Sequence, residues 1–200
     1  MKPKIYIAMP TMGETRTEML LFFLNINPKG EYDIKVNVTL VGHCTENRNY
    51  LIQKFLESDC EWLFLLDADT VPPMNVLDML KNDKDVCCGL YFVWMKGGLY
   101  PLAMKREGEK YNIIPEQDES LVEVDASGGG CMLLKRKVIE AIRSPYFKEL
   151  QDKYGCRSKG NDFYFCEKVK KAGYKIWLDK RIVCSHYKTI DLKNLLREVN

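Results

Sequence analysis

Two carboxylates stand one residue apart at the end of an apolar stretch. Asp67 and Asp69 follow residues 62–66, Trp-Leu-Phe-Leu-Leu, and precede the pair Pro72-Pro73. An apolar run of this length, bounded by turn-forming residues, predicts a strand that is buried on both faces, as in a parallel α/β sheet. Ligands of such sheets bind beyond the carboxyl ends of the strands, so both carboxylates are expected where a ligand would lie.

Carboxylates this close raise each other's pKa unless a cation or a group of hydrogen-bond donors compensates their charge. Mg²⁺ and Mn²⁺ are commonly held by one or two carboxylates together with the phosphates of a substrate. Asp67 and Asp69 therefore predict a divalent-cation site. The alternative is that one aspartate only ends the strand and caps the turn that leads into the prolines.

Composition indicates an ordinary globular protein. The chain has 200 residues, 46% of them hydrophobic and 29% charged, with no linker or low-complexity tract, so we expect a single domain. A net charge of +2 gives no indication of a nucleic-acid partner. No apolar run approaches the length of about 20 residues that a transmembrane helix needs. The eight dispersed cysteines are expected to be reduced, and the protein to be cytoplasmic.

Periodicity predicts how the chain positions these carboxylates. The first ninety residues show three strand-and-helix units, with strands at 5–9, 34–41, 62–69 and 85–92 and helices at 14–24, 46–56 and 74–80. Such units predict a right-handed, mainly parallel sheet. Later segments predict antiparallel or mixed additions, with strands at 99–105, 110–114, 121–125, 131–134, 175–178 and 182–184 and helices at 137–143, 161–172 and 191–199. Thr45 is the expected cap of the second helix, and Arg48 is expected away from that helix's apolar face.

Several motifs occur in a fixed order along the chain. They are the strand that ends in Asp67-Ala68-Asp69, the run Gly128-Gly129-Gly130, the helix start at Asn161-Asp162, the turn at 172–176, and His186. Together they resemble a nucleotide-sugar-dependent glycosyltransferase of the GT-A fold, similar to the family-2 enzymes, over about residues 4–189. The resemblance implies a Rossmann-type mixed α/β sheet flanked by helices, with a nucleotide-binding half at 1–92 and a half at 93–200 that completes the acceptor and metal sites.

The resemblance also implies roles for individual residues. Asp67 would contact the nucleotide and the metal, while Asp69 and His186 would bind the metal, Mn²⁺ or Mg²⁺. Asp162 would be the general base of an inverting reaction, with Asn161 replacing the family's usual glutamate. The alternatives are a packed or surface histidine and an aspartate that stabilises a helix start through capping and the macrodipole.

The same resemblance places a nucleotide-sugar donor and an acceptor, which the sequence does not identify. Pro10, Thr11 and Arg48 would contact the nucleotide, since arginine pairs with phosphate; a solvated arginine is the alternative. The glycines at 128–130, which permit positive φ and close backbone approach, would lie under the donor sugar, or form a bulge or turn. Trp94 would stack on an acceptor or pack in the core. Peripheral membrane contact is compatible with this interpretation.

Three rival hypotheses remain at this stage. Asp67 and Asp69 also match the first motif of haloacid-dehalogenase-like phosphatases, as nucleophile and acid/base, although the motif lies far from the first strand. Cys156, Cys166, Cys184 and His186 contain zinc-ligand residue types, without the close cysteine spacing of a zinc knuckle. The third hypothesis keeps the glycosyltransferase fold but has it bind a nucleotide sugar without transfer.

Overall fold

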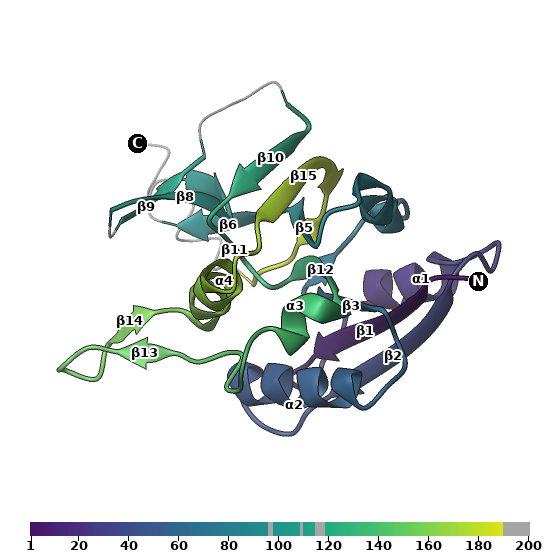
Figure 1. The fold of residues 1–200 in the computed structure, drawn as a ribbon, viewed down its shortest axis with the longest axis horizontal. Coiled ribbons are helices and arrows are strands. Elements are labelled where there is room, and N and C mark those ends of the chain that lie inside the picture. The colour runs from purple at the N-terminus through teal and green to yellow at the C-terminus, as the bar shows by residue number, and fades with distance from the viewer. Residues whose placement is uncertain (96–97, 109, 115–118, 190–200) are drawn as a thin grey trace.

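The computed structural model describes residues 1–95, 98–108, 110–114 and 119–189. Its centre is a seven-stranded mixed sheet with strand order β10-β15-β5-β12-β3-β1-β2 (Figure 1). The pairs β1 with β2, β1 with β3 and β15 with β5 are parallel, while β12 runs antiparallel to β3 and β5, and β10 to β15. Parallel strands from the first half and antiparallel additions from the second were both expected.

The first half forms three strands and the helices that cover them. The elements are β1 (Lys4–Pro10), α1 (Thr17–Asn25), β2 (Asp33–Thr39), α2 (Cys44–Leu56) and β3 (Trp62–Leu66). Side chains of β1 alternate between the faces: Tyr6 and Ala8 pack in the core with α2, while Ile5 and Ile7 pack in the core with α1. Residues 63–66 of β3 are at most 1% exposed, which confirms the strand buried on both faces.

The second half widens the sheet and adds small hairpins. Its elements are β4 (Thr70–Val71), η1 (Val76–Asn82), β5 (Val86–Leu90), β6 (Phe92–Met95), β7 (Gly98–Pro101), β8 (Ala103–Glu107), β9 (Lys110–Ile113), β10 (Leu121–Val124), β11 (Ala126–Ser127), β12 (Cys131–Lys135), α3 (Arg136–Glu140), β13 (Leu150–Gln151), β14 (Arg157–Lys159), α4 (Asn161–Lys171), β15 (Ile176–Val183) and β16 (Ser185–His186). Helices α2, α3 and α4 contribute to one core, and α1 and η1 to the other. The hairpin of β13 and β14 projects away from the sheet (Figure 1).

Helix starts differ from the expected ones for local reasons. Helix α1 begins three residues late because the Thr11 hydroxyl donates to the carbonyl of Glu14 and accepts the N–H of Gly13, which keeps 11–14 in a turn. Helix α2 is capped at His43 instead of Thr45: the backbone N–H of His43 donates to Glu46 at 2.8 Å.

Three later elements also differ. The helix expected after the prolines is a 3₁₀ helix, η1, and it ends at Asp83 with a left-handed φ of 48°. The strand expected at 99–105 is broken at Leu102, because β7 pairs with β6 whereas β8 pairs with β9 and β11. The two short strands expected at 175–184 are one strand, β15, with a register irregularity. The helix expected at 191–199 lies outside the described residues.

The described helices are all too short or too polar to cross a bilayer.

Candidate active site

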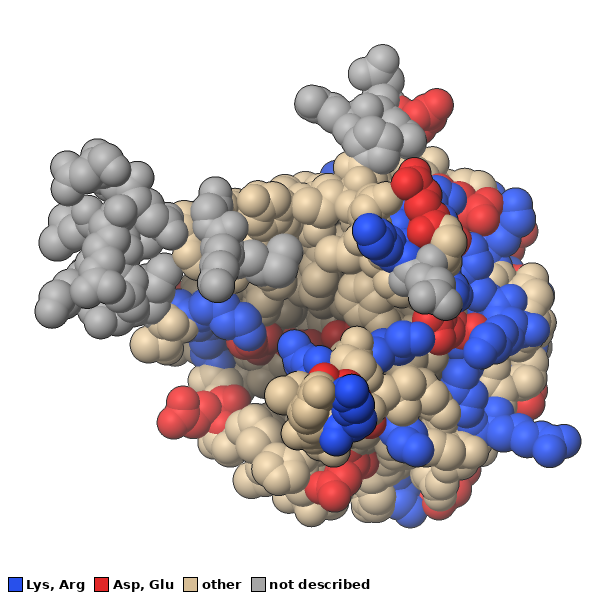
Figure 2. All heavy atoms as spheres, turned by 90° about the vertical axis from the view of Figure 1, so that its left-hand side faces the viewer, with Lys and Arg blue, Asp and Glu red and all other residues tan. Residues whose placement is uncertain are grey.

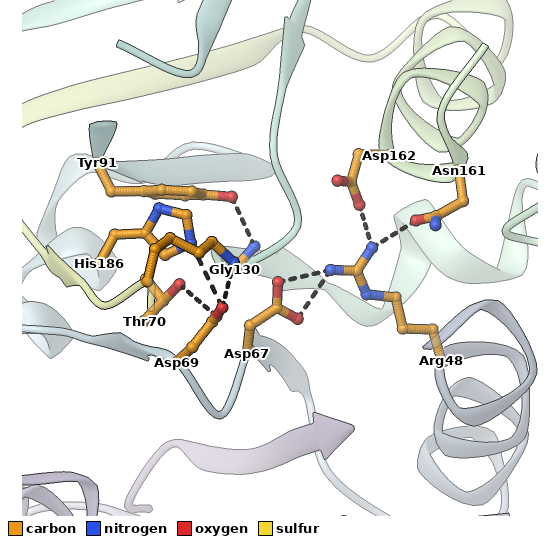
Figure 3. Close-up of polar contacts among 10 residues, drawn as sticks. Arg48, Asp67, Asp69, Thr70, Tyr91, Gly130, Asn161, Asp162 and His186 are labelled. Atoms are coloured by element: carbon orange, nitrogen blue, oxygen red, sulfur yellow. Dashed lines mark hydrogen bonds and ion pairs between the residues drawn. The ribbon is translucent and has the colours of Figure 1, made fainter. Parts of the chain in front are cut away.

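Asp67 and Asp69 lie in a tight turn between β3 and β4. The backbone N–H of Asp67 donates to the carbonyl of Gly130 at 3.1 Å, and the N–H of Thr70 donates to the carbonyl of Asp67 at 3.0 Å. The two carboxylates then take different partners: Asp67 contacts Arg48, whereas Asp69 contacts His186 (Figure 3). Asp69 also contacts Lys188. Cationic groups of the chain therefore compensate the two charges separately.

Arg48 lies between three polar side chains (Figure 3). Its Nη2 atom is 2.8 Å from each carboxylate oxygen of Asp67, and its Nη1 atom donates to Asp162 and to the amide oxygen of Asn161. The residue is only 2% exposed, although it was expected away from the apolar face of α2. That expectation is wrong because the two carboxylates supply the countercharge that allows a guanidinium to be buried.

The Asp162 carboxylate faces the site instead of capping its own helix. The N-cap of α4 is Gly160, and the Asp162 side chain accepts hydrogen bonds from Arg48 and from the backbone N–H of Gly129. Burial raises the pKa of Asp162, and the charge of Asp67 raises it further, while Arg48 and Gly129 act in the opposite direction. The net effect is a carboxyl whose pKa is above its ordinary value.

The three consecutive glycines are required by close contacts. A Cβ atom on Gly129 would lie 2.9 Å from Oδ1 of Asp162, and one on Gly130 would lie 2.9 Å from Oγ1 of Thr70. On Gly128 it would lie 1.9 Å from the hydroxyl of Tyr91. None of the three has φ in the left-handed region, so close approach, not positive φ, explains the run.

His186 reaches Asp69 because β16 pairs with β4. Its Nδ1 atom is 2.7 Å from the carbonyl oxygen of Phe92, and its Nε2 atom is 3.5 Å from Oδ2 of Asp69. A carbonyl only accepts, so Nδ1 carries the hydrogen and Nε2 faces the carboxylate. The hydrogen bond with Asp69 raises the pKa of His186, although burial lowers it. Burial raises the pKa of Asp69, but His186 and Lys188 outweigh it and hold that pKa below its usual value.

A cavity of about 1280 Å³ joins most of the predicted site residues. Its lining includes Pro10, Thr11, Asp67, Asp69, Asp162 and His186. The face of the molecule seen in Figure 2 is hollowed, with acidic atoms inside the hollow and basic atoms beside it. Arg48 and the glycines at 128–130 are not among the lining residues. Arg48 hydrogen-bonds to the lining residues Asp67 and Asp162. Trp94, on β6, is 46% exposed and pairs with Leu99, outside this lining.

No protein-family model matches the sequence, and neither does any curated protein. Solved structures do share its fold. A197 from STIV superimposes with a TM-score of 0.62 at 22% identity, over 94% of this chain and 86% of that one. GalNAc-T7, solved with UDP, GalNAc and Mn²⁺, gives a TM-score of 0.57 at 12% identity, over 99% of this chain and 47% of that one. This chain therefore spans about half of the second protein.

The chain has a GT-A-like fold. At these identities the likeness shows the fold alone: a mixed seven-stranded sheet flanked by helices, in one domain. It confirms the fold class that the order of motifs predicted.

The cavity contains side chains that fit a divalent cation. Asp69 offers a carboxylate, and the hydrogen bond to Phe92 leaves the Nε2 lone pair of neutral His186 directed at the same place. Both oxygens of Asp67 are already paired with Arg48. Mg²⁺ is usually bound through one or two carboxylates plus substrate phosphates, so Asp69, with His186 beside it, would be the protein side of such a site.

The zinc hypothesis is wrong for the described part of the chain. No three His, Cys, Asp or Glu side chains there are grouped closely enough to hold a metal by themselves. Cys156 is exposed, whereas Cys166 and Cys184 are buried, so the expected ligands are not gathered.

Two site residues carry no recognisable signal in the sequence. Lys188 donates to Oδ2 of Asp69. The hydroxyl of the buried Tyr91 accepts from the N–H of Gly130 at 3.1 Å, and the Tyr91 ring contacts that of His186 edge to face. A lone lysine and a strand-end tyrosine are common surface and core residues. Only the fold brings them to the carboxylates.

Proposed function

We propose that this protein is a metal-dependent glycosyltransferase that moves one sugar from a nucleotide-sugar donor to an acceptor hydroxyl. The observation that carries the proposal is the convergence of Asp67, Asp69, Asp162 and His186 on one cavity at the carboxyl end of β3. The GT-A-like fold supports it, because GalNAc-T7, which shares that fold, was solved with UDP, GalNAc and Mn²⁺. The cavity volume of about 1280 Å³ leaves room for a nucleotide-sugar donor.

Asp69 and His186 would hold Mn²⁺ or Mg²⁺, with the donor's phosphates completing its shell. Bound there, the cation would offset the negative charge of the leaving nucleoside diphosphate. Pro10 and Thr11 line the end of the cavity next to β1, where they would contact the nucleotide. Arg48 was assigned to the nucleotide phosphates, but its donors face Asp67, Asp162 and Asn161, so we assign it to holding those groups instead.

Asp162 would take the proton of the acceptor hydroxyl as its oxygen attacks the anomeric carbon. The bond to the nucleoside diphosphate breaks with its electron pair on the leaving group, and the anomeric configuration is inverted. A carboxyl with a raised pKa is better matched to accept a proton near neutral pH than an ordinary aspartate. Arg48 and Gly129 keep the carboxylate oriented toward the cavity.

The phosphohydrolase hypothesis fits these contacts less well. A nucleophilic aspartate needs an oxygen free to attack phosphorus, whereas both oxygens of Asp67 accept from Arg48. Non-catalytic binding of a nucleotide sugar would use the same cavity, and only turnover distinguishes it from transfer.

Thermal unfolding of the purified protein against UDP, GDP, CDP and their sugars, with and without Mn²⁺, tests the proposal. A ligand that binds the native state raises the midpoint by mass action. We expect one nucleotide to give a shift that requires the metal and that the Asp69→Ala variant loses. A lack of shift with every nucleotide would overturn the proposal.

A further inference from the structure

A second cavity, of about 460 Å³, opens beside the first. Its lining residues come from the β8–β9 hairpin, the end of β14 and helix α4: Arg106, Tyr111, Ser158, Lys159, Gly160, Phe163 and Glu167. The two cavities share Gly160 and Phe163. These residues flank Asp162 at the start of α4, so the smaller cavity meets the larger one beside the proposed base.

One wall of the smaller cavity is aromatic. Tyr111 and Phe163 meet edge to face, with ring centroids 4.8 Å apart and an interplanar angle of 89°. The two rings belong to β9 and α4, so their contact brings together segments that are distant in the sequence. An aromatic surface at the rim of a polar cavity suits the C–H face of a sugar ring.

The polar groups of the cavity gather around Glu167, which lies one helical turn after Phe163 on the same face of α4. Its Oε1 atom accepts from Nζ of Lys159 at 2.6 Å and from the hydroxyl of Tyr111 at 3.1 Å, and it lies 3.8 Å from Nη1 of Arg106. An ammonium has three donors and a guanidinium five, more than these contacts use. The cavity thus offers a carboxylate acceptor and N–H donors side by side.

From this arrangement we propose that the smaller cavity is the acceptor subsite and that the acceptor is a carbohydrate. Sugar hydroxyls both donate and accept, so they match a set that contains Glu167, Lys159 and Arg106, while the ring's C–H face packs on Tyr111 and Phe163. A ring held there extends one hydroxyl past Phe163 toward Asp162. The volume of about 460 Å³ lies within the range of about 300–1,000 Å³ typical of small-molecule sites.

The inference rests on the proposed function, and its test uses the donor that thermal unfolding identifies. Release of nucleoside diphosphate is measured with that donor alone and with methyl glycosides of glucose, galactose, mannose and N-acetylglucosamine. We expect at least one glycoside to accelerate release above hydrolysis. Lys159→Met and Tyr111→Phe should each raise KM for that glycoside by about tenfold. The first variant loses a donor to the sugar, and the second loses the hydroxyl that donates to Glu167, the carboxylate that would accept from the sugar.

The matched control is Lys153→Met, which removes a lysine of the same projecting hairpin outside either cavity lining. It should change the glycoside KM by less than twofold. Isothermal titration of the glycoside in the presence of the nucleoside diphosphate gives a second readout that does not depend on turnover, and thermal unfolding checks that each variant is folded.

Donor binding without acceleration by any glycoside would overturn this inference and leave the proposed function standing. Transfer to a serine or threonine peptide at a rate that Lys159→Met and Tyr111→Phe leave unchanged would also overturn it. Variants that raise the donor KM as much as the glycoside KM would assign the cavity to the donor and contradict the proposal. Failure of every nucleotide to bind is the separate failure of the proposed function.

Discussion

Nη2 of Arg48 lies 2.8 Å from each carboxylate oxygen of Asp67. The same guanidinium contacts Asp162 through Nη1, so two carboxylates from distant parts of the chain share one buried cation. Burial lowers the pKa of Arg48, but Asp162 and Asp67 outweigh it and hold that pKa well above its usual value. The proposed base and the first aspartate of the strand end are therefore positioned by one side chain.

Replacing Arg48 with Met should destabilise the fold. Removal of one member of a buried ion pair leaves uncompensated charge and costs about 3–5 kcal/mol. Urea unfolding at neutral pH measures the loss. In the double variant Arg48→Met/Asp162→Asn, part of the uncompensated charge is absent, so we expect the two effects to be less than additive by about 0.5–3 kcal/mol. Strict additivity would mean that the Arg48–Asp162 contact contributes nothing.

Arg48 also shows where prediction from sequence reaches its limit. The strand at 62–66 and the mainly parallel first half of the sheet follow from local patterns, since periodicity and turn residues fix the elements. The gathering of Asp67 and Asp69 with Asp162 and His186 is instead what the resemblance to GT-A enzymes implies. The partner of a polar residue is not local. Helix spacing places Arg48 on the same face as the buried Leu51 and Ile52, three and four residues later, which the residue type alone did not indicate. Only the fold brings Asp67 and Asp162 to its guanidinium.

Other departures have the same origin. The break at Leu102 arises because its N–H donates to the carbonyl of Tyr91 and its carbonyl accepts from Ser127 and Gly128, which ties two small sheets together. The residues themselves continue a strand-like pattern. Long-range pairing therefore decided the element boundary, as it did for the continuous β15.

Asp162→Asn should remove turnover while donor binding persists. Loss of a general base typically lowers a rate by about 10²–10⁴-fold. The metal-dependent nucleotide shift in thermal unfolding should survive, because the proposed nucleotide and metal contacts lie on other residues. In the wild type, the raised pKa of Asp162 places the acid limb of kcat/KM above the ordinary aspartate value of about 3.9, so activity is lost as the pH falls through that raised pKa. Unchanged turnover in the asparagine variant would favour non-catalytic binding.

Lys188 and Asp69 lead to a prediction about the metal. The Lys188 ammonium is paired with the Asp69 carboxylate that the cation would need. Lys188→Met should therefore lower the Mn²⁺ concentration that gives half of the nucleotide's thermal shift. We expect a decrease of up to about fivefold, the scale of an exposed ion pair. His186→Gln should raise that concentration by at least about tenfold. Lys188→Arg is the control that keeps the charge. If Lys188→Met instead abolished nucleotide binding, the lysine would be a phosphate ligand and not a competitor of the metal.

Gly129→Ala tests whether the glycine run exists to admit the carboxylate. An added methyl would lie 2.9 Å from Oδ1 of Asp162 and 3.1 Å from the Arg48 guanidinium, and both groups are pinned by their mutual contact. Overpacking of this kind costs about 1–3 kcal/mol, measured by urea unfolding, and the displaced base should also lower turnover.

Gly160→Ser provides the matched comparison for Gly129→Ala. Apart from its chain neighbours, no heavy atom of the described residues lies within 4 Å of a Cβ built on Gly160. Serine is favoured at the N-cap position that this glycine occupies. The serine variant should therefore be as stable as the wild type or more so. Equal stability of the Gly129 and Gly160 variants would show that Asp162 and Arg48 move aside at little cost. The close approach would then not explain why glycine stands at position 129.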